Sequence, residues 1–467
     1  MKSKQLPFLL ITIALFMLVV SPKWLSDGMF CDGLSYAVIS KNLAHGLGSF
    51  WDLFFTSDFE RHFRGQPSLA FGMESLFFRI LGDGYLVERA YSFITYLVTG
   101  FVLVRVWKHV AGKQYFVFYW LPLLLWLSVP VVIWGVSNNM LENTMAIFTM
   151  LSILFSIKSY QGKRVVNIIL SGVMVFLAVL SKGPVGLFPM ALPFWVFALN
   201  KKVSFKRFLQ DTVLMIAALT GSFLVLFILF PGSIDNLLAY LYTQVIYSVT
   251  KVTTVSSRFY ILGRFLTELV PMFVAFVMLT VFTRKIKWTH HNNLWVYILF
   301  LTGLSGVIPI MVSMKQSGFY LLPVFPLVAL AFGLYMVPEV KLLTDRINVT
   351  KRGFVVFKYF AFLLLVASLI VNLLQINKTG RDKEILHDVY LIESVIPHGT
   401  VVAVEPSITF DWLVVGYFWR NNIDCLNAEN SEDFDYLIVN KNYSDSLITG
   451  FQRVSVDLKK FDLYKRH

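Results

Sequence analysis

Charged residues and cysteines are both scarce in this sequence. Asp, Glu, Lys and Arg make up only 15% of its 467 residues, whereas a soluble globular protein has about 25%. The two cysteines are too few for a disulfide framework, and no CxxC or HExxH spacing suggests a metal motif. These absences exclude a disordered chain and a small disulfide-rich domain, and they argue against a large soluble enzyme.

Apolar and aromatic residues take the place of the missing charge. Hydrophobic residues account for 57% of the chain, the mean hydropathy is +0.66, and there are 44 Phe and 11 Trp. Eleven apolar segments are each about long enough to cross a hydrocarbon core of about 30 Å. The pattern therefore predicts an all-α polytopic membrane protein. The segments cover residues 5–22, 86–108, 114–134, 141–160, 165–181, 183–199, 209–231, 262–283, 293–312, 318–337 and 354–376.

The net charge of +13 is unevenly distributed between these segments. Lysine and arginine gather on every second loop, and the positive-inside rule places such loops in the cytoplasm. We therefore predict eleven spans, a cytoplasmic N-terminus with a retained first helix, and an external C-terminal tail. The charge orients the chain, so nucleic acid is not a predicted partner. The basic clusters are Lys2/Lys4, Arg105/Lys108/Lys113, Lys163/Arg164, Lys201/Lys202/Lys206/Arg207, Arg284/Lys285/Lys287 and Lys341/Arg346/Lys351/Arg352.

The external loops differ in length and composition. Loop 23–85 contains two short apolar runs, at 34–47 and 67–81, which predict helices lying along the outer membrane surface. Tail 377–467 is more polar, with strand-like runs at Val401–Val404 and Tyr436–Val439 and a helical stretch near Phe410–Trp419. We predict a transmembrane domain over residues 1–376 and a small external α/β domain over 377–467.

Asp32 is the first candidate for chemistry, because it lies at the outer membrane boundary just before a predicted interfacial helix. A carboxylate there could act as a general base toward a hydroxyl or amine acceptor while a lipid presents the other substrate. The alternative is a helix cap or a solvated loop acid, since Asp is common at helix starts.

Three further groups lie at the same predicted depth. Glu142 opens the fourth span within Asn138–Thr144 and is either a site residue or a dipole-stabilised helix start. Lys182, in the Ser181–Pro184 turn, could bind a lipid phosphate or snorkel to the interface. Lys315 and Tyr320 offer a cation and a phenol, or an interfacial belt pair, and Arg258 adds another cation. The convergence of acids and cations at one face is what transfer from a lipid-phosphate donor requires.

The same four groups carry a resemblance to a known family. Asp32-Gly33-x-x-Tyr36-Ala37-x-Ile39-Ser40 resembles the D-E-x-x-Y-A-x-I-S motif of bacterial GT-C glycosyltransferases of the lipid A aminoarabinose transferase and protein O-mannosyltransferase type. Glu142, the Ser181–Pro184 turn and the Lys315–Pro323 segment match its later motifs in order and spacing. The match covers residues 1 to about 335 and leaves the tail uncovered.

The resemblance implies a GT-C fold and a function. The enzyme would transfer a sugar from a polyprenyl-phosphate donor to a glycolipid, protein or polysaccharide acceptor, on the periplasmic face of a bacterial inner membrane. Asp32 would be the base and Glu142 would position the acceptor. The remaining implied residues, which would bind substrate or the lipid phosphate, are Tyr36, His62, Arg64, Lys182, Arg258, Lys315 and Tyr320.

The sequence also departs from the family pattern. The Asp-Glu pair is Asp32-Gly33, and a Glu associated with a bound metal is replaced by Gly65. Loop 232–261 contains no His, so we predict no metal and no cofactor, with His62 or Arg64 supplying the lost charge. Three alternatives remain: a catalytically degenerate relative, a lipid or saccharide transporter or flippase, and an envelope polymerase or ligase.

Overall fold

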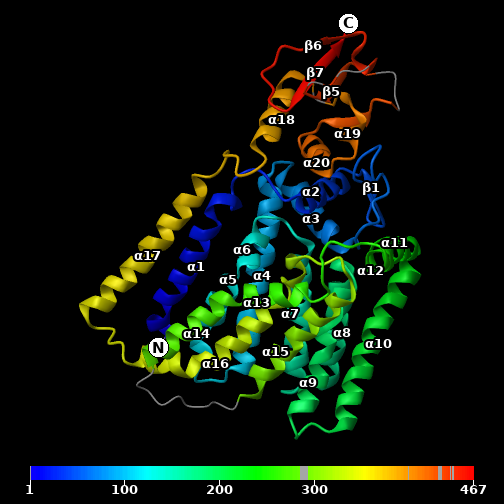
Figure 1. The fold of residues 1–467 in the computed structure, drawn as a ribbon. Helices are drawn as coiled ribbons and strands as arrows, with labels where there is room; N and C mark the ends of the chain where they lie inside the picture. The colour runs from blue at the N-terminus through cyan, green and yellow to red at the C-terminus, as the bar shows by residue number, and fades with distance from the viewer. Residues whose placement is uncertain (1, 284–292, 398, 430–433, 442, 444–445) are drawn as a thin grey trace.

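The structure is a computed structural model that describes residues 2–283, 293–397, 399–429, 434–441, 443 and 446–467. A large helical part carries a small mixed sheet at one end, beyond the helices labelled α2 and α3 (Figure 1). The basic cluster Arg284/Lys285/Lys287 lies outside the described residues.

Eight helices in the described residues are long and apolar enough to cross a membrane. Two bent pairs, with angles of 85° and 43° between their halves, bring the number to ten if each pair is one span. The long helices are α1 (Lys2–Trp24), α4 (Leu86–Val110), α7 (Leu141–Ser159), α8 (Arg164–Lys182), α10 (Phe205–Leu229), α15 (Leu294–Val307) with η4 (Ile308–Val312), α16 (Phe325–Asp345) and α17 (Arg352–Leu373). The bent pairs are η1 (Phe116–Phe118) and α5 (Trp120–Leu127) with α6 (Pro130–Val136), and α13 (Tyr260–Glu268) with α14 (Val270–Thr283).

The prediction of a polytopic helical membrane protein is confirmed, but the count of eleven spans is not reached. The segment at 183–199 forms η2 (Pro184–Ala191) and α9 (Leu192–Leu199), a shorter apolar piece that joins α8 to α10. Pro184, Pro189 and Pro193 explain the tight, short helix, because proline lacks the N–H that an α-helix needs.

The spans differ in how much of their surface is covered. Only 6% of the hydrophobic stretch of α10 and 11% of the stretch in α17 are buried inside the protein. In α7 the buried share is 78%. Exposed apolar helices fit contact with lipid, and the buried α7 is the centre of the bundle. α10 lies at one edge and α17, beside α1, at the opposite edge (Figure 1).

Both short helices predicted in the first external loop are present. They are α2 (Cys31–Ala44) and α3 (Leu69–Leu81), separated by the two-residue strands β1 (Gly48–Ser49) and β2 (Asp52–Leu53). α2 is not an open surface helix with one apolar face, since residues 33–43 are all buried. α3 and a helix from the C-terminal region cover it, so tertiary packing replaces the expected contact with the membrane surface.

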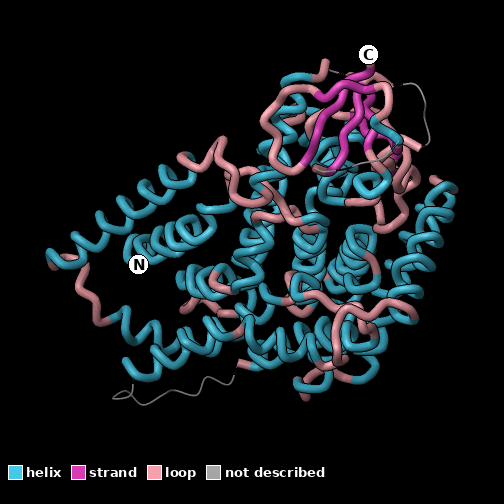
Figure 2. Tube along the Cα trace, turned by 45° about the horizontal axis from the view of Figure 1, so that its top comes forward, coloured by secondary structure: helices cyan, strands magenta, loops and turns pink. Residues whose placement is uncertain are grey.

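The C-terminal region contains a five-stranded mixed sheet in the order β4-β3-β5-β7-β6. Its first three strands are parallel and β7 and β6 are added antiparallel. The strands and the helix expected from the sequence are confirmed at β3, β5 and α20, and Figure 2 shows the strands gathered in one corner of the molecule. The elements are α18 (Lys383–Val395), β3 (Val401–Val404), α19 (Pro406–Thr409), α20 (Trp412–Arg420), β4 (Asp424–Asn427), β5 (Tyr436–Asn440), η6 (Ser446–Ile448), β6 (Phe451–Arg453) and β7 (Phe461–Arg466).

Candidate active site

Lys182 is the last residue of α8 and lies at the centre of the candidate site. Its ammonium is 3.3 Å from the carboxylate of Glu142 and donates a hydrogen bond to the Tyr36 hydroxyl at 3.4 Å. The lysine side chain is 7% exposed and the glutamate is fully buried. The structure thus joins three residues that the sequence places on three separate segments, and the lysine does not snorkel away from the protein.

The glycine that follows Lys182 explains how the turn is made. Gly183 has a φ of +100°, which favours glycine, and a Cβ there would lie 1.9 Å from the Tyr240 hydroxyl oxygen. That hydroxyl donates a hydrogen bond to the Lys182 carbonyl at 2.9 Å. The close contact at Gly183 and the hydrogen bond from Tyr240 therefore fix the backbone at the end of α8, next to the Lys182 side chain.

Asp32 lies in the first turn of α2 and is only partly exposed. Phe30 occupies the N-cap position, so Asp32 is not the capping residue. Burial raises the pKa of the Asp32 carboxyl, and the nearby positive charges of Lys182 and Lys315 oppose that rise. The side chain is thus a partly desolvated acid within electrostatic reach of both lysines.

Gly33 shows why this chain lacks the second acid of the family motif. A Cβ at Gly33 would lie 1.9 Å from the backbone oxygen of Asn138, so this packing admits no side chain at position 33. The start of α2 instead lies directly against the segment that leads into α7 and Glu142.

A cavity of about 370 Å³ opens beside the lysines. Its polar side chains include Lys182, Lys315 and Tyr320, and seven of its fifteen lining residues are apolar. Lys315 donates hydrogen bonds to Gln244 at 3.2 Å and to Ser248 at 3.4 Å. Burial, followed by the charge of Lys182, lowers the pKa of Lys315. A cavity that combines two cations with an extensive apolar lining suits a phosphate attached to a hydrocarbon chain. The apolar lining is Pro184, Val185, Val245, Val249, Pro309, Ile310 and Val312.

Four of the predicted binding residues, Tyr36, His62, Arg64 and Arg258, are not among those that line this cavity, and neither are Asp32 and Glu142. His62 is at the surface, where its Nδ1 lies 2.9 Å from Asp52. Arg258 is exposed and donates to the backbone carbonyls of Met311 and Val312. Arg64 is also exposed, and it is the nearby Gln66 that reaches the cavity.

The sequence interpretation missed one wall of the cavity. Tyr240, Gln244 and Ser248 come from α11 (Gly232–Tyr240), η3 (Leu241–Ile246) and α12 (Tyr247–Thr250), inside the segment treated as an external loop. Their spacing of four residues puts polar groups on one face of a helix. That periodicity is a signal that could have identified them.

Glu74 is a second buried acid that the sequence interpretation missed. It accepts hydrogen bonds from Ser40 of α2 at 2.8 Å and from Asn139 at 2.7 Å. The Asn139 side chain also donates to the carbonyl of Gly33 at 3.4 Å. Burial raises the Glu74 pKa to about 8 and outweighs both hydrogen bonds, which lower it. Glu74 therefore connects α3 to the two segments that carry Asp32 and Glu142.

The C-terminal region is joined to the transmembrane part by buried charges. Arg420, only 3% exposed, lies 2.7 Å from Asp27 and 3.2 Å from Glu88. One residue of α2, Lys41, donates to the carbonyls of Trp419 and Arg420 and to the Asn422 side chain. These contacts fix the C-terminal region onto the helix that carries Asp32.

Among the described residues, no three His, Cys, Asp or Glu side chains gather in a way that could hold a metal ion. The absence of a metal and of other cofactors stays a prediction from the sequence. Cys31 and Cys425 are both free thiols.

Comparison with solved structures identifies the fold. The chain superposes on ArnT from Cupriavidus metallidurans in its apo state with a TM-score of 0.66 and 13% identity, covering 98% of this chain and 96% of that one. The structure of ArnT bound to undecaprenyl phosphate gives a TM-score of 0.64 at 13% identity, with 98% and 97% covered. No family model and no curated protein sequence matches the chain. The chain therefore has the fold of this GT-C transferase over nearly its whole length, and the predicted fold class is confirmed.

Proposed function

We propose that this protein is a membrane glycosyltransferase that moves a sugar from a polyprenyl-phosphate donor to an acceptor on the external face of a bacterial inner membrane. The observation that carries the proposal is the cavity that Lys182 and Lys315 line together with seven apolar residues, with Asp32 outside its lining but within electrostatic reach of both lysines. The fold shared with ArnT, which has been solved bound to undecaprenyl phosphate, supports the same class of donor.

The chemistry would be a direct displacement at the anomeric carbon. The acceptor hydroxyl or amine forms a bond to that carbon and gives its proton to Asp32. The bond from the carbon to the phosphate oxygen breaks, and its electron pair leaves with the polyprenyl phosphate. Lys182 and Lys315 stabilise the negative charge that develops on this phosphate. Attack from the face opposite the leaving group inverts the configuration.

Glu142 and Tyr36 would act through Lys182. The Glu142 carboxylate and the Tyr36 hydroxyl hold the ammonium from two sides, so its position is fixed before the donor arrives. A transporter is less well supported, because Glu142 and Lys182 lie at the ends of α7 and α8 rather than near the middle of the bilayer.

Replacement of Asp32 by Asn tests the proposal, because it keeps the size of the side chain and removes the base. We expect turnover at saturating polyprenyl-phosphate sugar to fall by about 10²–10⁴-fold, with little change in donor affinity. Burial raises the Asp32 pKa, so wild-type turnover should rise with pH through a value above the ordinary one near 3.9. Near-normal saturated turnover in Asp32→Asn would remove the catalytic assignment.

A further inference from the structure

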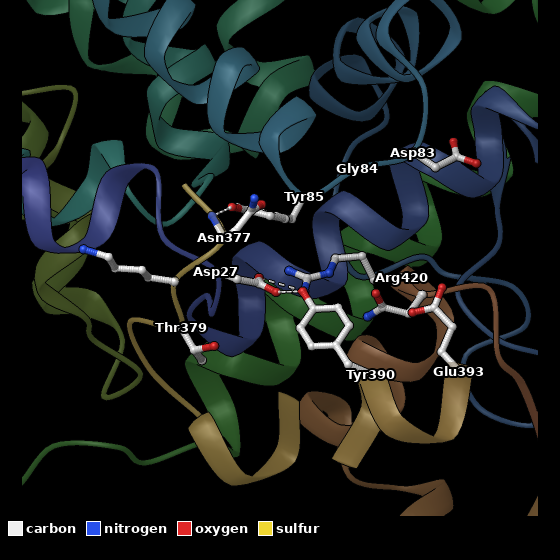
Figure 3. A pocket seen from close by; sticks show the side chains of 11 residues that line it. Asp27, Asp83, Gly84, Tyr85, Asn377, Thr379, Tyr390, Glu393 and Arg420 are labelled. Atoms are coloured by element: carbon white, nitrogen blue, oxygen red, sulfur yellow. Dashed lines mark hydrogen bonds and ion pairs between the residues drawn. The ribbon is translucent and has the colours of Figure 1, made fainter. Parts of the chain in front are cut away.

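A second cavity, of about 430 Å³, lies at the seam between the two parts of the chain. Asp27 follows α1, Asp83 to Tyr85 connect α3 to α4, and Asn377 to Thr379 connect α17 to α18. Tyr390 and Glu393 of α18 and Arg420 of α20 complete it (Figure 3). Its volume falls in the range of about 300–1,000 Å³ that is typical of pockets for small organic ligands.

The charges in this cavity are largely paired, which restricts the ligand. Arg420 is engaged by Asp27 and Glu88, and the Tyr390 hydroxyl also donates to Asp27. Figure 3 shows Asp27, Arg420 and Tyr390 converging at the centre of the cavity. Its most buried cation already holds two carboxylates, and the other lining cation, Lys378, is exposed to solvent, so the site is a poor receptor for a free phosphate.

The other lining groups suit a molecule rich in hydroxyl groups. Asp83 and Glu393 contribute carboxylates, which accept hydrogen bonds, although one Asp83 oxygen already lies 2.8 Å from the ring of His45. Thr379, Asn377 and Asn421 contribute hydroxyl and amide groups. Two tyrosines, Tyr85 and Tyr390, also line the cavity, and Tyr390 is 40% exposed. An aromatic ring beside hydrogen-bonding groups offers contact to the apolar face of a sugar ring as well as to its edge.

We propose that this cavity is a saccharide-binding subsite that holds the sugar portion of the acceptor, in neutral or amino-sugar form. This inference rests on the proposed transferase function. Asp27 precedes Asp32 by five residues, so the two Cα atoms lie at most about 18 Å apart. A saccharide bound here would thus keep the rest of the same acceptor molecule within reach of Asp32.

Gly84 provides a test that leaves the ion pairs intact. It lines the cavity, its φ is outside the left-handed region, and a Cβ there would meet nothing within 4 Å. A Gly84→Trp variant therefore fills space without backbone strain. Gly353→Trp is the matched control, since Gly353 has the same open surroundings at the start of α17 and does not line the cavity.

The experiment uses the full chain in lipid nanodiscs and saturation-transfer NMR with three probes: a neutral disaccharide, a glucosamine disaccharide and glucose 1-phosphate. We expect at least one of the two uncharged or amino probes to bind the wild type and Gly353→Trp, and its signal to be lost in Gly84→Trp. Glu393→Gln should weaken binding about tenfold, as expected for one lost charge-assisted hydrogen bond, whereas Glu384→Gln, on the exposed face of α18, should not.

Undecaprenyl-phosphate binding, measured in parallel by native mass spectrometry, separates this inference from the proposed function. If the wild type binds neither disaccharide, if glucose 1-phosphate binds better than both, or if Gly84→Trp binds like the wild type, the saccharide subsite is wrong. If the lipid phosphate fails to bind while the disaccharide result holds, the transferase proposal fails and the saccharide site stands without its assigned role.

Discussion

The ammonium of Lys182 lies 3.3 Å from the carboxylate of Glu142, and both side chains are almost completely buried. Two opposite charges in a buried position are stable only as a pair, because either charge alone would be desolvated without a partner to compensate it. Their shared position also fixes a cation beside the cavity proposed to bind the lipid phosphate.

Breaking this pair from one side should therefore destabilise the protein. We expect Lys182→Met to cost about 3–5 kcal/mol, as is typical for a buried ion pair that loses one partner. The double variant Glu142→Gln/Lys182→Met should recover much of that loss. Thermal unfolding in nanodiscs measures both, and a double variant no more stable than the single one would contradict the pairing.

Lys315 should affect donor affinity more than folding, because it is only half-buried and its partners are the neutral Gln244 and Ser248. We expect Lys315→Met to weaken undecaprenyl-phosphate binding by about tenfold or more, through the loss of a charge-assisted hydrogen bond. Lys251→Met is the control, because Lys251 is an exposed lysine just after the helices that carry Gln244 and Ser248. Equal affinities in the two variants would remove Lys315 from the phosphate site.

Glu74 predicts a pH dependence of stability. Its pKa is about 8 in the folded chain and 4.5 in its ordinary state, so between these values the folded state holds a proton that the unfolded state has lost. The contribution of Glu74 to the free energy of unfolding should therefore fall by about 1.4 kcal/mol per pH unit as pH rises across that window, and it should level off above the window. Glu74→Gln mimics the protonated acid, so the variant should become more stable relative to wild type as pH rises from 6 to 8. The measurement is the melting temperature of both proteins at a series of pH values. If the two melting temperatures change in parallel between pH 6 and 8, Glu74 is already charged in the folded protein and the prediction is wrong.

Arg420 should control the attachment of the C-terminal region. Arg420→Met leaves Asp27 and Glu88 buried without their cation, and we expect faster proteolysis and hydrogen exchange over residues 401–429. Arg453→Met removes an ion pair with Asp462 whose arginine is 61% exposed, and pairs of this kind contribute at most about 1 kcal/mol. If both variants exchange alike, the seam is held by other contacts.

Membrane topology is a separate prediction. Reporter fusions after residues 112, 162, 205, 288 and 348 should all report the cytoplasm, because each follows or lies within a basic loop; of these, 288 lies outside the described residues. External signals among them would place Asp32 on the wrong side for the proposed donor.

Segment length and charge were enough to predict the helical framework, because hydrophobic runs are set by local sequence. They did not predict the bends. Residues 114–134 look like one span, yet the helix turns by 85° where Ser128 and Val129 precede Pro130. The short η2–α9 piece has the same origin, with three prolines inside a run of suitable length.

The site was predictable in part. Asp32, Glu142, Lys182, Lys315 and Tyr320 were singled out because acids and cations near a membrane boundary are unusual, and the fold brings Lys182 into contact with Glu142 and places it with Lys315 and Tyr320 at one cavity. Arg420 was not singled out, since its partner Asp27 is 393 residues away in the sequence and nothing local indicates that they meet. Glu74 looked like an ordinary helix residue, and only tertiary burial makes it unusual.

Lys41 adds a consequence for the order of assembly during synthesis. Its hydrogen bond to Asn422 spans 381 residues, so the helix that carries Asp32 reaches the bilayer long before the groups that anchor its far end have been translated. Contacts of such long range close slowly, because the intervening chain must first be ordered. The helix that carries Asp32 would thus be locked only after the C-terminal region has folded, and an unfinished chain would have the cavity proposed for the donor before the proposed base was fixed.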